Sequence, residues 1–423
     1  MISGIIIIIF VAGYAAIAFE HKLKIDKAAV ALLTGVLCWL FYFLTSQHVA
    51  EAEEQLFKHL ADIAAILFFL MGAMTIVEVI DSHHGFNLIT DNIKSRSVPK
   101  LLILITVLTF FLSAILDNLT TAIVMTSLSN KLIPEKKKRL WFVSMVIIAA
   151  NAGGAWSPLG DVTTTMLWIG GQITAFNIIA KTLLPSIVVT SIPLFILSMK
   201  FRNQTVEKLE DSKSKKPVES NIILFTGVGL LIFVPIFKTV THMPPFMGML
   251  LALSIIWFVS SIIHLNKQSD ERYKYSVTSA LRKIDTSGIL FFLGILLAVS
   301  ALQAYGILAD LADITTSQIK NEYITGTILG LLSSIIDNVP LVAAAQGMFT
   351  LEMFPTDHVF WEFLALSAGT GGSAIIIGSA AGIAVMGIEK VEFFWYLKNI
   401  SWIALLGFFA GLATYILQQN LIG

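Results

Sequence analysis

Charged residues are scarce in this chain. Asp, Glu, Lys and Arg make up 13% of its 423 residues, whereas a soluble domain carries about 25%. Hydrophobic residues make up 56% of the chain, and the mean hydropathy is +0.82. So few charges could not cover the surface of a soluble fold of this size. The composition therefore excludes a soluble protein and predicts an integral membrane protein.

Cysteine and net charge are also nearly absent. The single cysteine, Cys38, lies in an apolar run and cannot form an internal disulfide, so a thiol-redox or zinc protein is not expected. The 28 Lys and Arg offset 28 Asp and Glu, which gives no indication of a nucleic-acid partner. We expect no cofactor, and we expect the lipid bilayer to be the main partner. A homodimer is left open.

A cleavable signal peptide is not expected at the N-terminus. No Lys or Arg precedes the apolar residues 2–19, whereas Lys22, Lys24 and Lys27 follow them. A signal peptide has the opposite order of charge. We therefore expect a retained span with the N-terminus outside.

Ten apolar runs have about the 20-residue length of a membrane span. They lie at 2–19, 27–45, 60–80, 140–170, 176–199, 221–238, 244–264, 286–305, 359–390 and 394–419. With the N-terminus outside, the loops predicted inside hold 23 of the 28 Lys and Arg, and the loop 46–59 predicted outside is acidic. The positive-inside rule favours this topology. It predicts a multi-pass protein of the cell (inner) membrane with both termini on the periplasmic or extracellular side.

Two further apolar stretches, near 98–133 and 322–353, are each interrupted by an Asp-Asn pair. Their arms 119–133 and 323–336 have 15 and 14 residues, whereas a crossing needs about 17 or more. We therefore expect two re-entrant hairpins, with Asp117-Asn118 and Asp337-Asn338 at their tips.

The two halves of the chain resemble each other. SAILDN at 113–118 recurs as SSIIDN at 333–338, and the glycines of 153–160 recur at 371–378. Each half contains five crossings, an odd number, so the halves should lie in opposite orientations. This predicts an all-α fold of two inverted-topology repeats, with about ten transmembrane helices, two re-entrant hairpins and two broken helices. The repeats are expected at 1–199 and 221–423, joined by a cytoplasmic linker at 200–220, an architecture typical of secondary transporters.

The hairpin tips are candidate cation ligands. Placing an isolated carboxylate at membrane depth costs on the order of 3 kcal/mol, so a carboxylate found there indicates a functional site. Carboxylate, carboxamide and hydroxyl oxygens, here from Asp117, Asn118 and Thr120 and from Asp337 and Asn338, suit a hard cation. The alternative is that each Asp only caps the second arm of its hairpin.

A third carboxylate, Asp161, lies in the break of the run 140–170. Pro158 and the neighbouring glycines should unwind the helix there, which leaves Asp161 as an N-cap before Thr163 and Thr164. The matching break at 369–379 has no carboxylate. We therefore expect unequal halves, in which Asp117 and Asp161 form the main site together with Asn151 and Thr164.

A possible pH-responsive cluster follows the third apolar run. Glu78 and Asp81 share one helical face and are followed by His83 and His84, and histidine titrates near neutrality. The alternative is a solvated helix end.

The motifs SAILDNLTTA (113–122) and NAGGAWSPLGDVTTTMLW (151–168) resemble those of NhaD-type sodium/proton antiporters of the ion-transporter superfamily. The resemblance implies exchange of cytoplasmic Na⁺ or Li⁺ for external H⁺ by alternating access, with Na⁺ held at Asp117, Asn118, Asn151 and Asp161. The full set of candidate cation- and proton-binding residues is Ser113, Asp117, Asn118, Thr120, Asn151, Ser157, Asp161, Thr163, Thr164, Ser333, Asp337, Asn338, Thr370 and Ser373.

Three other functions compete with cation exchange. A Na⁺-coupled anion transporter, for a dicarboxylate or arsenite, would share the architecture, but an anion site favours Arg, Lys or bare helix N-termini over carboxylates. An intramembrane aspartyl protease, the enzymatic alternative, would need a partner for the Leu159-Gly160-Asp161 segment, and none is found. A channel is disfavoured because inverted broken repeats are typical of alternating access.

Overall fold

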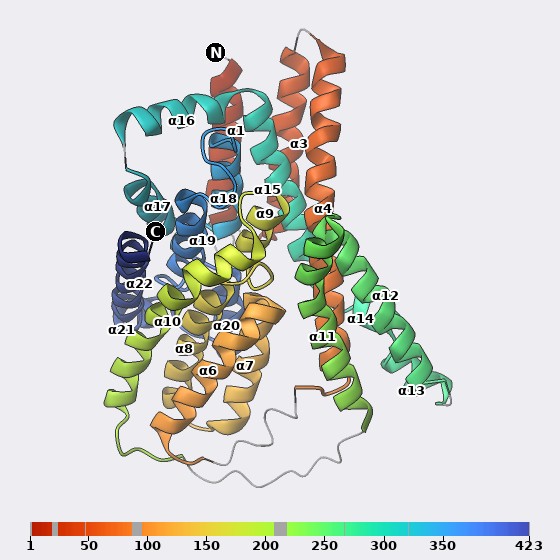
Figure 1. Ribbon diagram of the computed structural model, residues 1–423, viewed down its shortest axis with the longest axis vertical. Coiled ribbons are helices and arrows are strands. Elements are labelled where there is room, and N and C mark those ends of the chain that lie inside the picture. The colour runs from red at the N-terminus through yellow and green to blue at the C-terminus, as the bar shows by residue number, and fades with distance from the viewer. Residues whose placement is uncertain are drawn as a thin grey trace.

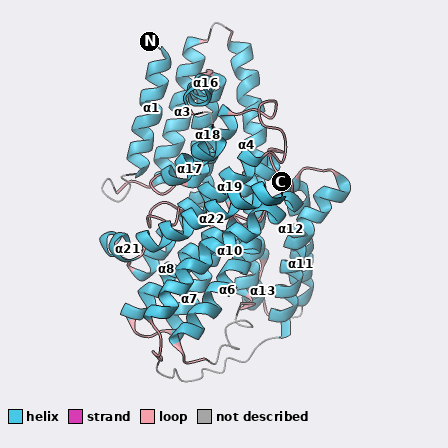
Figure 2. Ribbon diagram, turned by 60° about the vertical axis from the view of Figure 1, so that its left-hand side comes forward, coloured by secondary structure: helices cyan, strands magenta, loops and turns pink. Residues whose placement is uncertain are grey.

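The regular structure of the chain is helical. A computed structural model describes residues 2–18, 24–46, 48–86, 95–206, 218–265, 267–319 and 321–422, and its regular elements over these residues are all helices (Figure 2). Eight of them are long and apolar enough to cross a membrane. They are α3 (Lys27–Thr45), α4 (Val49–Ser82), α6 (Val98–Leu116), α10 (Ala175–Lys200), α11 (Val218–Thr241), α12 (Pro245–Ile263), α15 (Thr286–Ala304) and α22 (Ser401–Ile422). The prediction of an all-α, multi-pass membrane protein is confirmed.

Helix α4 corrects one detail of the predicted topology. Most of the predicted loop 46–59 is helical, because α4 begins at Val49 and continues for 34 residues. Alanine and glutamate dominate its first turns and favour a helix. At 1.5 Å per residue the helix is about 51 Å long, which exceeds the ~30 Å hydrocarbon core. The acidic residues therefore lie on a helical extension of the span.

Two predicted features fall partly outside the described residues. Residues 207–217, which include most of the lysines of the predicted linker, are not described, and neither are residues 19–23 with Lys22. The linker and the repeat boundaries stay predictions.

The helices form two groups. The first, called here the long-helix group, contains α1 (Ile2–Ala18), α3, α4, α11, α12 and α15, which pack on one another (Figure 1). The second, called here the broken-helix group, contains α6, α7 (Asn118–Leu132), α8 (Lys136–Gly154), α9 (Val162–Ile169), α10, α17 (Glu322–Leu332), α18 (Asn338–Met348), α19 (Val359–Gly371), α20 (Ala380–Glu389) and α22. Both groups draw helices from both halves of the chain. Four shorter helices lie in the connections. Helices α13 (Ser269–Lys274) and α14 (Val277–Leu281) lie between α12 and α15, α21 (Phe393–Asn399) lies between α20 and α22, and α16 (Ile307–Gln318) leads from α15 of the first group to α17 of the second.

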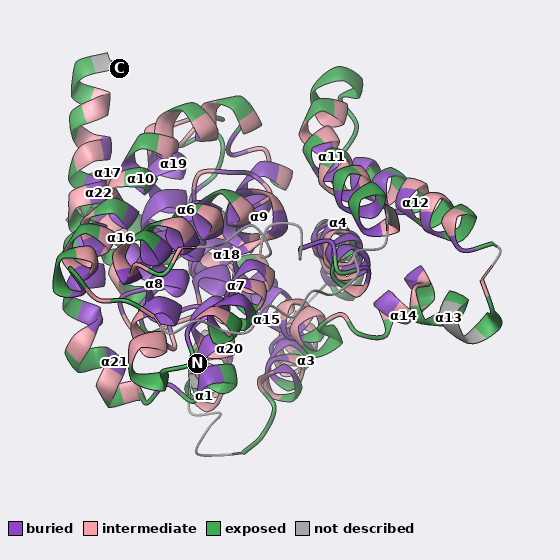
Figure 3. Cartoon of the chain, turned by 90° about the horizontal axis from the view of Figure 1, so that it is seen from below, coloured by how far each residue is buried: buried purple, intermediate pink, exposed green. Residues whose placement is uncertain are grey.

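The interior of the broken-helix group is the most buried part of the molecule. Every residue of α8 from Phe142 to Gly154 is buried. Figure 3 shows buried residues concentrated around α6, α8, α9 and α18, whereas α12 and α13 carry exposed faces. A polar side chain on the last turns of α8 must therefore find its partners inside the protein.

Two hairpins and two broken helices occur where the sequence predicts them. The hairpin α6–α7 turns at Asp117 and the hairpin α17–α18 turns just before Asn338. In Figure 1 the first hairpin opens at the lower end of the molecule, and the second is entered from α16 at the upper end. The two hairpins therefore enter the molecule from opposite ends, as an inverted repeat requires. The repeat itself stays a prediction. Helix α6 has 19 residues and is long enough to span by itself.

Matching contacts hold each hairpin to its broken helix. A Cβ added at Gly153 would lie 2.2 Å from the carbonyl oxygen of Phe110, and one added at Gly371 would lie 2.0 Å from that of Gly330. The Ser113 hydroxyl donates to Ala150 O at 2.5 Å, and the Ser333 hydroxyl donates to Ala368 O at 2.7 Å. The backbones thus touch at corresponding positions of the two halves, and only glycine fits there.

Adding one methyl group at this crossing should destabilise the fold. In Gly153→Ala the new Cβ collides with the Phe110 carbonyl, and overpacking of this kind costs about 1–3 kcal/mol. Thermal unfolding of the purified protein in detergent should show a lower midpoint. Gly229→Ala is the matched control, because a Cβ on Gly229 of α11 meets nothing within 4 Å. Equal midpoints for the two variants would contradict the close crossing.

Candidate cation site

One buried carboxylate, that of Asp161, receives hydrogen bonds from both hairpin tips. Asp161 is 1% exposed and caps α9, where its Oδ1 accepts from the Thr163 backbone N–H at 3.0 Å. Asn118 Nδ2 of the first tip donates to its Oδ2 at 3.0 Å. Asn338 Nδ2 of the second tip donates to Oδ2 at 3.0 Å and to Oδ1 at 3.3 Å. Asp161 therefore connects two segments that lie 220 residues apart in the chain.

Asn151 extends this network to the second break. Its Oδ1 accepts from Asn118 Nδ2 at 3.2 Å. Its Nδ2 donates to the hydroxyls of Ser373 and Ser379, at 2.9 Å each, across the break between α19 and α20. We call the connected side chains the central network. Its members are Asn118, Asn151, Asp161, Asn338, Ser373 and Ser379.

The central network contains one acidic side chain and no basic one. Its other members are neutral amides and hydroxyls, and within the described part of the chain no Lys or Arg forms an ion pair with Asp161. Neutral donors satisfy the oxygen atoms but do not cancel the charge. A carboxylate in such surroundings is stabilised by taking up a proton or a cation.

The tip aspartates lie beside the network rather than in it. Asp117 accepts from the Thr120 N–H and from the Thr120 hydroxyl, both at 2.8 Å, and Asp337 accepts from the Val339 N–H at 3.2 Å. These are capping bonds, and both residues are half-buried. Asn118 of the first tip contacts Asp161 directly, whereas the hydrogen bonds of the Asp117 carboxylate are to Thr120. The main site predicted at Asp117, Asp161, Asn151 and Thr164 stays a prediction.

The two tips differ in backbone conformation. Asp117 has φ 78° and ψ 158°, a region almost restricted to glycine, whereas Asp337 has φ −48°. A residue held in such a conformation costs of order 1–3 kcal/mol and persists only where its surroundings enforce it. Capping of Thr120 is one such constraint at the first tip.

The remaining candidate residues mostly bond to nearby backbone. The Ser157 hydroxyl donates to Ala114 O at 2.5 Å, and the Thr164 hydroxyl donates to Asp161 O at 2.9 Å. The Thr370 hydroxyl donates to Leu366 O at 2.6 Å. Together with the Ser113 and Ser333 bonds described above, these contacts position the breaks and tips around the network.

Three of the four residues proposed to sense pH lie at the partly exposed end of α4, where Asp81 interacts electrostatically with Glu78 and His84, and the fourth, His83, is buried. Glu78 forms an ion pair with Lys283 at 3.0 Å, and Asp81 and His84 are exposed. His83, which directly follows α4, is 3% exposed, and its ring packs against the rings of His264 and Tyr275 at 5.0 and 5.1 Å. Burial lowers the pKa of His83 to about 4, so the ring is neutral at physiological pH.

Sequence reasoning missed two buried carboxylates: Glu389, which forms an ion pair with Arg139 at 2.8 Å, and Glu362. Glu362 on α19 is 1% exposed and accepts hydrogen bonds from Asn177 of α10 and from Tyr415 and Gln419 of α22. Its position inside the apolar run 359–390 was the available signal. The contacts join three helices of the broken-helix group and lie apart from the central network.

Known proteins resemble this chain over nearly its whole length. The family described as "Citrate transporter" matches residues 14–362. "Sodium/proton antiporter 1" of Arabidopsis thaliana is 46% identical over 419 residues, which cover 98% of this chain and 72% of that protein. "Sodium/proton antiporter 2" of the same plant is 44% identical and covers 98% of this chain and 99% of its own. The "Na(+)/H(+) antiporter NhaD" of Vibrio cholerae is 29% identical over 449 residues, or 98% and 91% of the two chains.

Removing the network charge should weaken cation binding without unfolding the protein. Asp161→Asn keeps the shape and one acceptor oxygen but loses a charged ligand worth about 1.5–3 kcal/mol. We expect apparent Na⁺ affinity to fall roughly ten- to hundredfold. The measurement is the rise in unfolding temperature with Na⁺ at constant ionic strength. Asp62→Asn is the control, because Asp62 is exposed on α4. Unchanged Na⁺ stabilisation in Asp161→Asn would remove Asp161 from the site.

Buried His83 should make stability fall in acid. Its pKa, about 4 when folded, lies below its ordinary value of 6.5. The unfolded chain therefore takes up a proton first as the pH falls below about 6.5, and stability is lost between there and about pH 4. Down to pH 5 the loss is roughly 2 kcal/mol.

The check is thermal unfolding at pH 7 and pH 5. His83→Gln should flatten the pH dependence, and His84→Gln, next to it and exposed, should not. The neighbouring groups His264, Glu219 and Lys267 remain in both variants. Equal pH dependence in the two variants would show that His83 does not contribute to it.

Proposed function

The chain belongs to the NhaD-type antiporters of the ion-transporter superfamily, and from this we propose that it exchanges cytoplasmic Na⁺ or Li⁺ for external H⁺ by alternating access. The family makes it a transporter rather than an enzyme. One structural observation supports the proposal most strongly: a single buried carboxylate is bonded to both hairpin tips and, among the described residues, forms no ion pair with a Lys or Arg.

Competition at Asp161 would couple the two ions. A buried carboxylate can be neutralised by a proton or by Na⁺. Once one of them is bound, the negative charge that would attract the other is gone. The Asn118 and Asn338 amides donate to the carboxylate through Nδ2, and Asn151 Oδ1 accepts from Asn118. Rotation of these amides would turn oxygen ligands toward a Na⁺ ion at Asp161. Releasing one ion before accepting the other then moves them in opposite directions.

The shared position of the tips offers a basis for alternating access. Asn118 and Asn338 each donate to Asp161, so the occupant of that carboxylate acts on both hairpins at once. A neutralised Asp161 accepts hydrogen bonds less strongly than an ionised one. Binding at the network would thereby change how firmly both tips are held.

Anion transport is the second candidate, and the family description "Citrate transporter" favours it. The composition of the site opposes it, because the central network has one carboxylate, two more flank it, and none of its six side chains is basic. A citrate site would need positive charge to offset several carboxylates. We therefore place cation exchange first.

The proposal also includes the membrane location, the orientation of the termini and the partners of the protein. The protein would lie in the cell (inner) membrane with both termini outside, and its transported partners would be Na⁺ and H⁺ in a lipid bilayer. A homodimer is compatible with this arrangement.

The decisive test is ion exchange in everted membrane vesicles from cells that lack other sodium antiport. Addition of Na⁺ or Li⁺ should dissipate a preformed pH gradient, and addition of citrate should not. Because H⁺ and Na⁺ compete, the half-maximal Na⁺ concentration should rise as pH falls, by up to about tenfold per pH unit. Asp161→Asn vesicles are the negative control. A half-maximal concentration that stays constant with pH would indicate independent sites, and a response to citrate alone would favour anion transport.

A further inference from the structure

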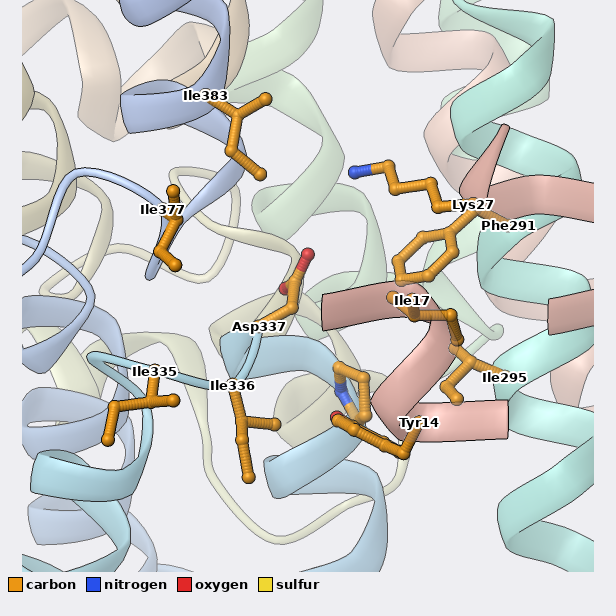
Figure 4. Close-up of a pocket in the computed structure, with 11 residues that line it drawn as sticks. Tyr14, Ile17, Lys27, Phe291, Ile295, Ile335, Ile336, Asp337, Ile377 and Ile383 are labelled. Carbon is orange, nitrogen blue, oxygen red and sulfur yellow. The ribbon is translucent and has the colours of Figure 1, made fainter. Parts of the chain in front are cut away.

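The second hairpin tip faces a pocket between the two helix groups. Asp337 lines a cavity of about 60 Å³ together with Tyr14 of α1, Lys27 of α3 and Phe291 of α15. The other lining residues are apolar: Ile17, Ile295, Ile335, Ile336, Pro340, Ile377 and Ile383. Figure 4 shows the Asp337 carboxylate and the Lys27 side chain extending into the same space. The pocket thus exposes the tip to a helix of the other group.

Among the residues that the structure describes, the charged ones that line this pocket are Lys27 and Asp337. The Lys27 ammonium lies 4.6 Å from the centre of the Phe291 ring, a cation–π contact that orients it. The adjacent Asp26 is engaged elsewhere, since it caps α3 and accepts from the Ser287 hydroxyl. In an apolar pocket two opposite charges are weakly screened, so each strongly affects the other.

The two charges are close enough to share a pocket but are not paired. Among the ion pairs of the described residues none joins Lys27 to Asp337, whose carboxylate accepts from the Val339 N–H. The pocket volume of about 60 Å³ is large enough to hold a small ion or water. A cation that reached Asp337 would therefore meet a like charge already in place.

We propose that Lys27 is a tethered counter-cation of Asp337, which competes with Na⁺ or H⁺ for this carboxylate and so lowers the cation affinity of the second tip. The inference rests on the proposed cation exchange and names a regulator of it. When the tip holds no ion, the ammonium offsets the charge of Asp337 and attracts the tip toward α3. An arriving cation takes over that neutralising role, which weakens the attraction between the broken-helix group and the long-helix group.

The first tip has no equivalent. Within the described residues, the contacts of the Asp117 carboxylate are to Thr120, and no Lys or Arg is among them. The two halves would therefore differ in a second respect: only the second hairpin faces a fixed positive charge.

The test compares four proteins: wild type, Lys27→Gln, Lys27→Arg and Lys24→Gln. Lys24 is the matched control, because it lies three residues before Lys27, in the connection between α1 and α3, but is exposed and does not line the pocket. Lys27→Gln should lower the half-maximal Na⁺ concentration about three- to tenfold, since a partly screened positive charge is removed. Lys27→Arg retains the charge and should stay near wild type, as should Lys24→Gln.

A double variant decides whether Asp337 is the target. In the Asp337→Asn background, Lys27→Gln should change the half-maximal Na⁺ concentration by less than about twofold, because the carboxylate that Lys27 acts on is gone. An undiminished effect in that background would overturn the assignment. So would equal values for Lys27→Gln and Lys24→Gln. Lys27→Met replaces Lys27→Gln if the latter fails to fold.

The same proteins are also titrated with Na⁺ by thermal unfolding, which needs no transport. If wild-type vesicles show no Na⁺-dependent exchange, the proposed function fails, and the order of Na⁺ stabilisation among the variants still decides the role of Lys27. If exchange is present and the variants do not differ in either assay, the inference about Lys27 fails alone.

Discussion

The structure depends on the burial of one ionisable carboxylate. Asp161 lies at the centre of the broken-helix group, where an uncompensated charge is expensive. Neutral hydrogen-bond donors stabilise the carboxylate: a backbone N–H of α9 and one side-chain amide from each hairpin tip. These donors can reach Asp161 only because α8–α9 and α19–α20 are interrupted and both hairpins turn at the same depth. The breaks and tips are therefore consequences of the same requirement.

Close backbone packing supplies the precision that this arrangement needs. The glycine crossings at Gly153 and Gly371 bring each hairpin against its broken helix, and the Ser113 and Ser333 hydroxyls fix the register. An error of one ångström there would separate the tip amides from Asp161. The long-helix group contributes from outside, through the pocket where Lys27 faces Asp337.

The sequence predicts features that depend on local chemistry. Apolar runs, the Gly and Pro of the breaks, and the Asp-Asn pairs are visible in a one-dimensional pattern, and they indicate the fold class, the hairpins and the capping position of Asp161. The sequence does not predict that Asn118 and Asn338, rather than Asp117, contact Asp161. The orientation of these tip side chains is set by packing between helices that are distant in the chain. For the same reason the sequence does not pair His83 with His264, and its charge pattern predicts a loop where α4 begins.

The backbone of Asp117 affects how the composition of the two tips is interpreted. At φ 78° and ψ 158° every side chain is strained, because the tolerance of short polar residues for positive φ is confined to ψ of about 30–60°. Glycine would be the residue of lowest strain at the first tip, so its backbone conformation gives no reason for an aspartate there. Asp337, at φ −48°, carries no such strain. Of the two tips, the first therefore holds its carboxylate at the greater conformational cost.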